Sequence, residues 1–113
     1  MKTNEKYQLL KSSLEFTVEI IRYSQLLELN HRKTIAQKLL QAGLKINTYI
    51  YEAQTAILNK DLISKLDKAR KSLEEALYWF LQCVNSRYFD EDPRIIRKAN
   101  ALLKEISAEV TVG

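Results

Sequence analysis

Residues that break helices are almost absent from this chain. Only two glycines and one proline occur among its 113 residues, and one of the glycines is the terminal Gly113. Gly and Pro mark most turns, so a chain with so few of them, rich in Leu, Lys, Glu and Ala, favours a few long helices over many short strands. With 46% hydrophobic residues, a chain of this length suits one domain, residues 1–113, around a single core.

Apolar residues recur with helical spacing in four segments that short polar breaks separate. The predicted helices are residues 5–29, 34–58, 60–86 and 93–110. Thr34 followed by Gln37 fits a capping box at the second start, with Asn30 as the competing N-cap, and Asp92–Pro93 is a typical helix start. Short breaks between helices of this length predict an all-α fold, an antiparallel up-down-up-down four-helix bundle.

The third and fourth segments carry one apolar stripe each, which is what a helix on the surface of a bundle needs. The third stripe is Leu62, Leu66, Ala69, Leu73, Ala76, Leu77, Phe80 and Val84, and the fourth is Ile95, Ala99, Leu102, Leu103, Ile106 and Val110.

The first two segments carry two apolar stripes each. In the second, one stripe is Ile35, Leu39, Ala42, Ile46, Ala53 and Ile57, and the other includes Leu40 and Leu44. In the first, one face is Leu10, Leu14, Thr17, Ile21 and Gln25. One apolar stripe on each helix is enough to form the core of a single bundle, so a second stripe predicts a homo-oligomer. The expected interface is Leu9, Phe16, Ile20, Tyr23, Leu27, Leu40, Leu44, Tyr51 and Leu58.

Gly43 lies inside the second predicted helix, where it costs about 1 kcal/mol relative to Ala. Ala36 and Asn47 share its side of the helix. We therefore expect a neighbouring helix to approach closely at this point.

The positive charge of the chain is concentrated in one segment. The net charge is +4, and residues 31–60 carry Arg32, Lys33, Lys38, Lys45 and Lys60 against a single carboxylate, while the rest of the chain is balanced. A charged run of this kind is most often an ordinary solvated helix face.

The same charges could contact phosphates if the protein assembles. Lys38 and Lys45 lie seven residues apart on one helix face, and oligomerisation would multiply them into a belt. We therefore predict RNA or DNA as a possible partner. The expected contacts are Arg32, Lys33, Lys38 and Lys45, with Arg94, Arg97 and Lys98 as a second basic group on the fourth helix.

The sequence offers no catalytic constellation. His31 is the only histidine and Cys83 the only cysteine, which cannot form the usual zinc spacing, and no phosphate-binding glycine motif is present. The acidic pairs Glu74–Glu75 and Glu91–Asp92 suit a solvated helix face and a helix start. We therefore expect a protein that is not an enzyme and that holds no cofactor and no metal.

The aromatic pair Tyr78–Trp79 supports an alternative function. Trp79 projects off the core stripe, so it either seals the edge of the core or anchors a partner. In the second case the protein is an interaction or scaffold module that binds a protein partner through Tyr78, Trp79 or the Tyr88–Phe89 loop.

Nothing in the sequence indicates a membrane or a secretory route. The first thirteen residues are charged and lack an apolar signal core, and no apolar run approaches the ~18 residues that span a bilayer. A single cysteine excludes an intrachain disulfide. These features predict a cytoplasmic protein.

A scattered set of residues between positions 35 and 82 matches the pattern of a known family. The matching residues are Gln37-Lys38-Leu39-Leu40, Ile46, Ile50, Glu52-Ala53, Lys60-Asp61-Leu62-Ile63, Lys65-Leu66, Ala69, Lys71, Glu75 and Tyr78-Trp79. Through them the chain resembles bacterial four-helix-bundle proteins of the 23S rRNA intervening-sequence family. The family commonly has Ser-Ile-Gly-Ala-Asn where this chain has larger residues at 45–49. That departure leaves open a sister group of the same fold, the accessory variability determinants of diversity-generating retroelements.

The resemblance implies more than the stripes do. It implies a homopentameric ring without enzymatic activity, and, for the sister group, a reverse transcriptase and nucleic acid as partners. The stripes and their spacing by themselves support only the prediction that the protein is not a monomer.

Overall fold

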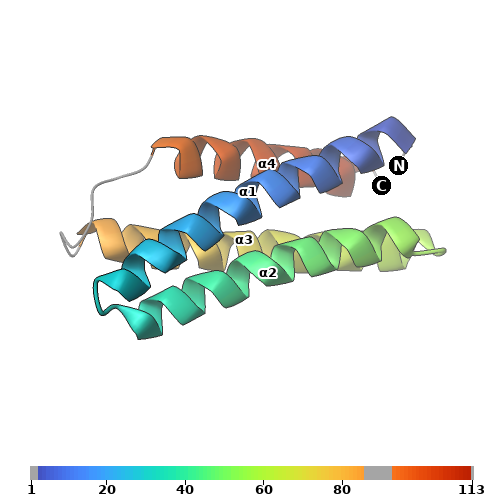
Figure 1. Cartoon of the computed structure of the whole chain (residues 1–113). Coiled ribbons are helices and arrows are strands. Elements are labelled where there is room, and N and C mark those ends of the chain that lie inside the picture. Colours follow the sequence, from blue (N-terminus) through green and yellow to red (C-terminus); the bar gives the residue numbers. More distant parts are fainter. Residues whose placement is uncertain (1–2, 86–92, 113) are drawn as a thin grey trace.

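The computed structural model of the chain contains four helices and, in the part that it describes, no strand. It describes residues 3–85 and 93–112, and side chains for residues 8–85 and 93–110. The helices are α1 (Thr3–Leu29), α2 (Lys33–Thr55), α3 (Asn59–Asn85) and α4 (Pro93–Val112), and they lie side by side (Figure 1).

The four helices form a closed ring of contacts. α2 packs against α1 and α3, and α4 packs against the same two helices, so that α2 and α4 stand diagonally across the bundle. Figure 1 shows the first turns of α1 and the last turns of α4 at the same end of the molecule. Ser12 of α1 donates a hydrogen bond to Glu105 of α4 there, at 3.0 Å.

The core lies between the four helices and confirms the stripes predicted for the last two. Leu66, Leu73 and Phe80 of α3 are fully buried, as are Leu102 and Ile106 of α4. Half-buried apolar side chains at the ends of the same stripes pack against this core.

The structure reverses the two stripes predicted for the first helix. Five residues assigned to an oligomer interface form the inward face of α1 instead, and they are Leu9, Phe16, Ile20, Tyr23 and Leu27. The ring of Tyr23 meets that of Phe80 edge to face, with centroids 5.0 Å apart. Helical periodicity identifies two stripes but not which one faces inward. The stripe with the bulkier apolar side chains fills the interior, and the stripe that includes Gln25 faces outward except at Thr17, which is buried.

α2 ends earlier than its apolar pattern predicts. Its last residue is Thr55, and Ala56 is extended at φ −69° and ψ 130°, so the prediction of a helix to Leu58 is wrong. Ile57, predicted for the core stripe, is 97% exposed in the turn. Leu58 therefore lies in the turn as well, where its carbonyl accepts hydrogen bonds from the first turn of α3, and not on a helix face.

The turn between α1 and α2 does not use the predicted caps. Lys33 begins α2 after Arg32, which makes no side-chain cap, and Thr34 lies inside the helix. The Asn30 amide donates to the Leu26 carbonyl at 2.8 Å and so closes α1 instead. Backbone N–H groups of the turn donate to carbonyls of the last turn of α1, around His31 in the left-handed region at φ 62°.

α1 approaches α2 closely at Gly43, as the position of this glycine in the sequence predicts. A Cβ at this position would lie 2.9 Å from Cγ2 of Ile20. The Thr17 hydroxyl donates to the Gly43 carbonyl at 3.3 Å, so the buried hydroxyl has a partner. The absence of a side chain at Gly43 therefore allows Ile20 to pack against the backbone of α2.

We expect Gly43→Ala to lower the free energy of unfolding by about 1 kcal/mol, because the clash with Ile20 outweighs the gain in helix propensity. Urea denaturation at one fixed protein concentration measures the change. In an Ile20→Ala background the clash is gone, and the same substitution should stabilise the protein. If Gly43→Ala is equally destabilising in both backgrounds, the Ile20 contact is not the reason for the glycine.

Candidate functional site

The bundle leaves an apolar surface on the outer side of α1 and α2. Its residues are Leu10, Leu14, Val18 and Ile21 of α1 with Leu40, Leu44 and Tyr51 of α2, and we call it the α1/α2 surface. Leu14, Val18, Leu44 and Tyr51 are 49%, 45%, 47% and 60% exposed. A hollow of about 310 Å³ runs along its α1 half, between Leu10 and Val18.

The two halves of this surface are adjacent because the Gly43 contact joins them. Leu14 and Ile21 lie three residues before and four residues after Thr17 in α1, and Leu40 lies three residues before Gly43 in α2, so these side chains flank the seam where α1 meets α2. The interface predicted on the second helix therefore stays exposed at Leu44 and Tyr51. On the first helix, Leu14 of the stripe that includes Gln25 is exposed, as is Val18 beside it, and Leu26 and Leu29 are exposed near the end of α1.

Lys38 and Lys45 lie on the solvent side of α2, both exposed. Among the described residues, neither has a carboxylate within ion-pair distance. Their positions are about 100° or more around the helix from Leu44 and Tyr51, toward α3 rather than α1. The lysines and the α1/α2 surface thus occupy neighbouring sides of one helix without overlapping.

The second basic group lies elsewhere. Arg94, Arg97 and Lys98 line a surface hollow of about 360 Å³ on α4, diagonally across the bundle from α2. Arg97 donates to the carbonyl of Pro93 at 3.3 Å. One protomer therefore does not gather the seven predicted basic residues into one patch. Arg32 immediately precedes α2 and Lys33 begins it, at the end of the bundle where α4 also starts (Figure 1).

A buried carboxylate that the sequence pattern does not single out lies between α1 and α4. Glu19 faces inward on α1, with Arg22 at 3.6 Å and Lys98 of α4 at 3.9 Å. In the sequence it is one of several balanced charges, and only its place on the inward stripe, between Phe16 and Ile20, distinguishes it. Glu19 draws Lys98 toward α1 and reduces the charge that Lys98 offers to a ligand.

The neighbouring aromatic side chains Tyr78 and Trp79 of α3 lie in different environments. Trp79 is half-buried and packs against the core, and its buried indole N–H has no acceptor among the described residues. Tyr78 is 54% exposed, with its ring 5.1 Å from that of Trp79. Trp79 therefore seals the edge of the core, and Tyr78 is the side chain that a partner could reach. The Tyr88–Phe89 loop lies outside the described residues.

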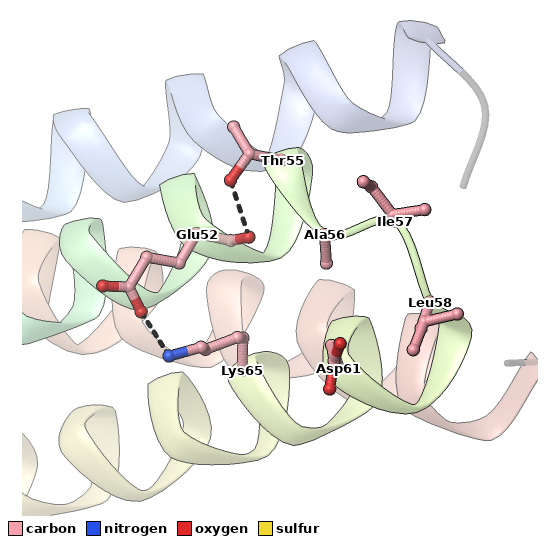
Figure 2. A pocket seen from close by; sticks show the side chains of 7 residues that line it. All are labelled: Glu52, Thr55, Ala56, Ile57, Leu58, Asp61 and Lys65. Carbon is pink, nitrogen blue, oxygen red and sulfur yellow. Dashed lines mark hydrogen bonds and ion pairs between the residues drawn. The ribbon is translucent and has the colours of Figure 1, made fainter.

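The turn between α2 and α3 borders a hollow of about 560 Å³ (Figure 2). The Nζ atom of Lys65 lies 2.7 Å from Oε2 of Glu52 and links the two helices beside the turn. This hydrogen bond raises the pKa of Lys65, against the opposing effect of desolvation. Glu52, the only carboxylate among residues 31–60, is therefore already engaged with α3.

Ion pairs between residues one turn apart follow one another along the outer face of α3. Asp67 lies 2.7 Å from Arg70 and 3.3 Å from Lys71, and Arg70 lies 2.8 Å from Glu74. Hydrogen bonds from Arg70 first, and then from Lys71, lower the pKa of Asp67. These contacts agree with a structural role for Glu74. Cys83 is buried in the core, and its burial raises the pKa of the thiol.

Two other kinds of site are absent from the part of the chain that the structure describes. No group of three or more His, Cys, Asp or Glu side chains there is placed to hold a metal ion. None of the helices within those residues is both long enough and apolar enough to cross a bilayer.

Comparisons with known proteins agree with this architecture. A search of curated proteins gives no match. The fold is similar to the crystal structure of a protein of unknown function from the S23 ribosomal protein family of Bacteroides thetaiotaomicron, with a TM-score of 0.88, 24% identity, and coverage of 95% of this chain and 98% of that one. The profile of the 23S rRNA-intervening sequence protein family matches residues 5–111, so the chain belongs to that family.

Proposed function

We propose that the chain folds as an antiparallel up-down-up-down bundle, self-associates through the α1/α2 surface, and acts as a non-enzymatic nucleic-acid-binding accessory protein in the cytoplasm. The observation that carries the assembly is the exposure of Leu14, Val18, Leu44 and Tyr51 on adjacent sides of two packed helices. Clustered apolar side chains of this size on an otherwise charged bundle are typical of an interface.

A second copy of the chain is the occupant that fits this surface best. Leu, Val and Tyr side chains from α1 and α2 offer two apolar ridges, and the α1 ridge of one copy can pack against the α2 ridge of the next. Such a head-to-tail contact closes into a ring when the rotation between copies is correct. A ring of five is what the family resemblance implies.

Nucleic-acid binding rests on the free lysines of α2. Lys38 and Lys45 are about 10 Å apart along the helix, and assembly through the neighbouring α1/α2 surface would repeat the pair on every subunit. Lysines contact phosphates without reading bases, so the expected binding is independent of sequence and sensitive to salt.

A second candidate is a scaffold that binds a protein. Tyr78 and Leu81 are large, exposed side chains three residues apart on the outer side of α3. A protein partner, such as the reverse transcriptase that the sister group implies, could dock there, and the positive charge of α2 would then be incidental.

We expect light scattering on the protein as it elutes from a size-exclusion column to give a mass at least twice the 13.2 kDa of one chain. Val18→Glu and Leu44→Glu should each shift the protein toward the monomer while the helical circular-dichroism signal is retained, because both side chains are exposed in the bundle. Leu81→Glu on α3 is the matched control and should leave the mass unchanged. A wild-type monomer at micromolar concentration would contradict the assembly.

Wild-type protein should bind fluorescein-labelled RNA or DNA at low salt, with an affinity that falls steeply as salt rises. In fluorescence anisotropy, Lys38→Gln/Lys45→Gln should weaken binding and reduce the slope of log K against log salt by about 0.9 for each duplex phosphate that is no longer neutralised. Lys60→Gln/Lys104→Gln removes the same charge from other helices. Equal effects of the two double variants would indicate general attraction rather than a site on α2.

Tyr78→Ala and Trp79→Ala should show which of the two side chains packs the core and which is available to bind a partner. We expect Trp79→Ala to lower the free energy of unfolding by about 2 kcal/mol or more, because its ring packs against the core, and Tyr78→Ala to change it little. Urea denaturation measures both. A partner captured at high salt after nuclease treatment, and absent with Tyr78→Ala, would favour the scaffold function over nucleic-acid binding.

A further inference from the structure

We propose that the phosphate-binding surface continues from α2 onto α3 through Lys68, which the ring of Tyr49 places beside Lys45. The ligand is the sugar–phosphate backbone of a nucleic acid, which would follow the outer groove between α2 and α3. The proposal rests on the proposed nucleic-acid-binding function and specifies where in each protomer the backbone lies. The residues of this α2/α3 strip are Lys38, Lys45, Tyr49 and Lys68.

A tyrosine ring joins the charges of the two helices. The Nζ atoms of Lys65 and Lys68 lie 5.9 and 6.0 Å from the centroid of the Tyr49 ring, within the range of a cation–π contact. Tyr49 belongs to α2 and both lysines to α3. The ring therefore holds two ammonium groups of α3 against α2, although 16 or more residues separate them from Tyr49 in the sequence.

The two lysines over the ring differ in their available charge. Lys65 is paired with Glu52 at 2.7 Å, so most of its charge is neutralised within the protein. Lys68 has no carboxylate within ion-pair distance among the described residues. Lys68 is thus the side chain of this pair that can contact a phosphate.

Helix geometry puts Lys45 next to this position. Lys45 precedes Tyr49 by four residues and therefore lies one turn away on the same side of α2. Because Lys68 lies over the Tyr49 ring, the strip continues from Lys38 through Lys45 to Lys68 along one side of the bundle. Two carboxylates lie on that side of α3, Glu75 seven residues after Lys68 and Asp61 seven residues before it, and no described lysine or arginine lies within ion-pair distance of either.

The position of the strip is compatible with assembly. The α1/α2 surface lies on the side of α2 toward α1, and the strip lies on the side toward α3. A neighbouring copy on the first would leave the second open. The basic hollow of α4 is diagonally opposite, so a backbone in the α2/α3 groove would not reach Arg94 or Arg97 of the same protomer.

The chemistry of the strip favours phosphates over bases. The Tyr49 ring already has two ammonium groups within cation–π range, and these contacts compete with the stacking of a base on the ring. The strip itself is made of three lysines and a tyrosine, and it offers point charges rather than the amide and guanidinium groups that form planar, two-pronged contacts to base edges. It should therefore tolerate any sequence, with Tyr49 as a positioning residue for Lys68.

The test is fluorescence anisotropy of the full-length, assembled protein with a labelled RNA duplex and a DNA duplex of the same sequence. Lys68→Gln should weaken binding about threefold to tenfold at low salt and lower the salt slope by about 0.9 if Lys68 neutralises one duplex phosphate. Lys104→Gln on α4 removes the same charge away from the strip and should have little effect. Glu75→Gln should strengthen binding by a similar factor.

Three further variants distinguish a loss of binding caused by the missing charge of Lys68 from one caused by a change in the fold. Lys68→Arg keeps the charge and should bind as the wild type does. Tyr49→Phe keeps the ring and should also bind normally, whereas Tyr49→Leu should weaken binding, since the ammonium group of Lys68 loses its support. Light scattering should show the same mass for every variant.

The outcomes distinguish the two proposals. If wild-type protein binds and Lys68→Gln behaves as Lys104→Gln does, the α3 extension is overturned while nucleic-acid binding through α2 stands. A weakening of binding in Lys68→Arg equal to that in Lys68→Gln would also overturn it. If the wild type binds neither duplex at low salt, the proposed function fails, and this inference fails with it.

Discussion

The packing of Ile20 against Gly43 is the contact on which the arrangement of this bundle depends. At this point α1 and α2 approach so closely that a Cβ on Gly43 would collide with Ile20. A close contact fixes the rotation of both helices about their axes, because a branched side chain must point at the bare backbone opposite it. Once Ile20 faces inward, Phe16, Tyr23 and Leu27 face inward with it, and Leu14 and Val18 are turned out.

That rotation creates the surfaces on which the functional proposals rest. The outward stripe of α1 lies beside Leu44 and Tyr51 of α2 and leaves an apolar area that water covers in a single bundle. On its other side, α2 meets α3, where Tyr49 holds Lys65 and Lys68. A helix with two flanks of different chemistry can take part in assembly through one and bind a polyanion through the other.

Ion pairing decides which charges of the protein are available. Glu52 neutralises Lys65, Asp67 and Glu74 engage Arg70, and Glu19 draws Lys98 toward α1. A count along the sequence treats all of these lysines and arginines alike. Several described basic side chains have no carboxylate within ion-pair distance, and three of them, Lys38, Lys45 and Lys68, lie together along the α2/α3 groove.

The sequence by itself determined that the chain is made of four long helices, that α3 and α4 have one inward stripe each, and that a neighbour approaches closely at Gly43. These features follow from local spacing and the scarcity of Gly and Pro, which act within a few turns of a helix. Only the tertiary structure decided which of two apolar stripes of α1 is inside, because periodicity is the same for both. It also decided that α2 ends at Thr55 and that Tyr49 joins Lys45 to Lys68, since turns and contacts between helices depend on packing across the bundle.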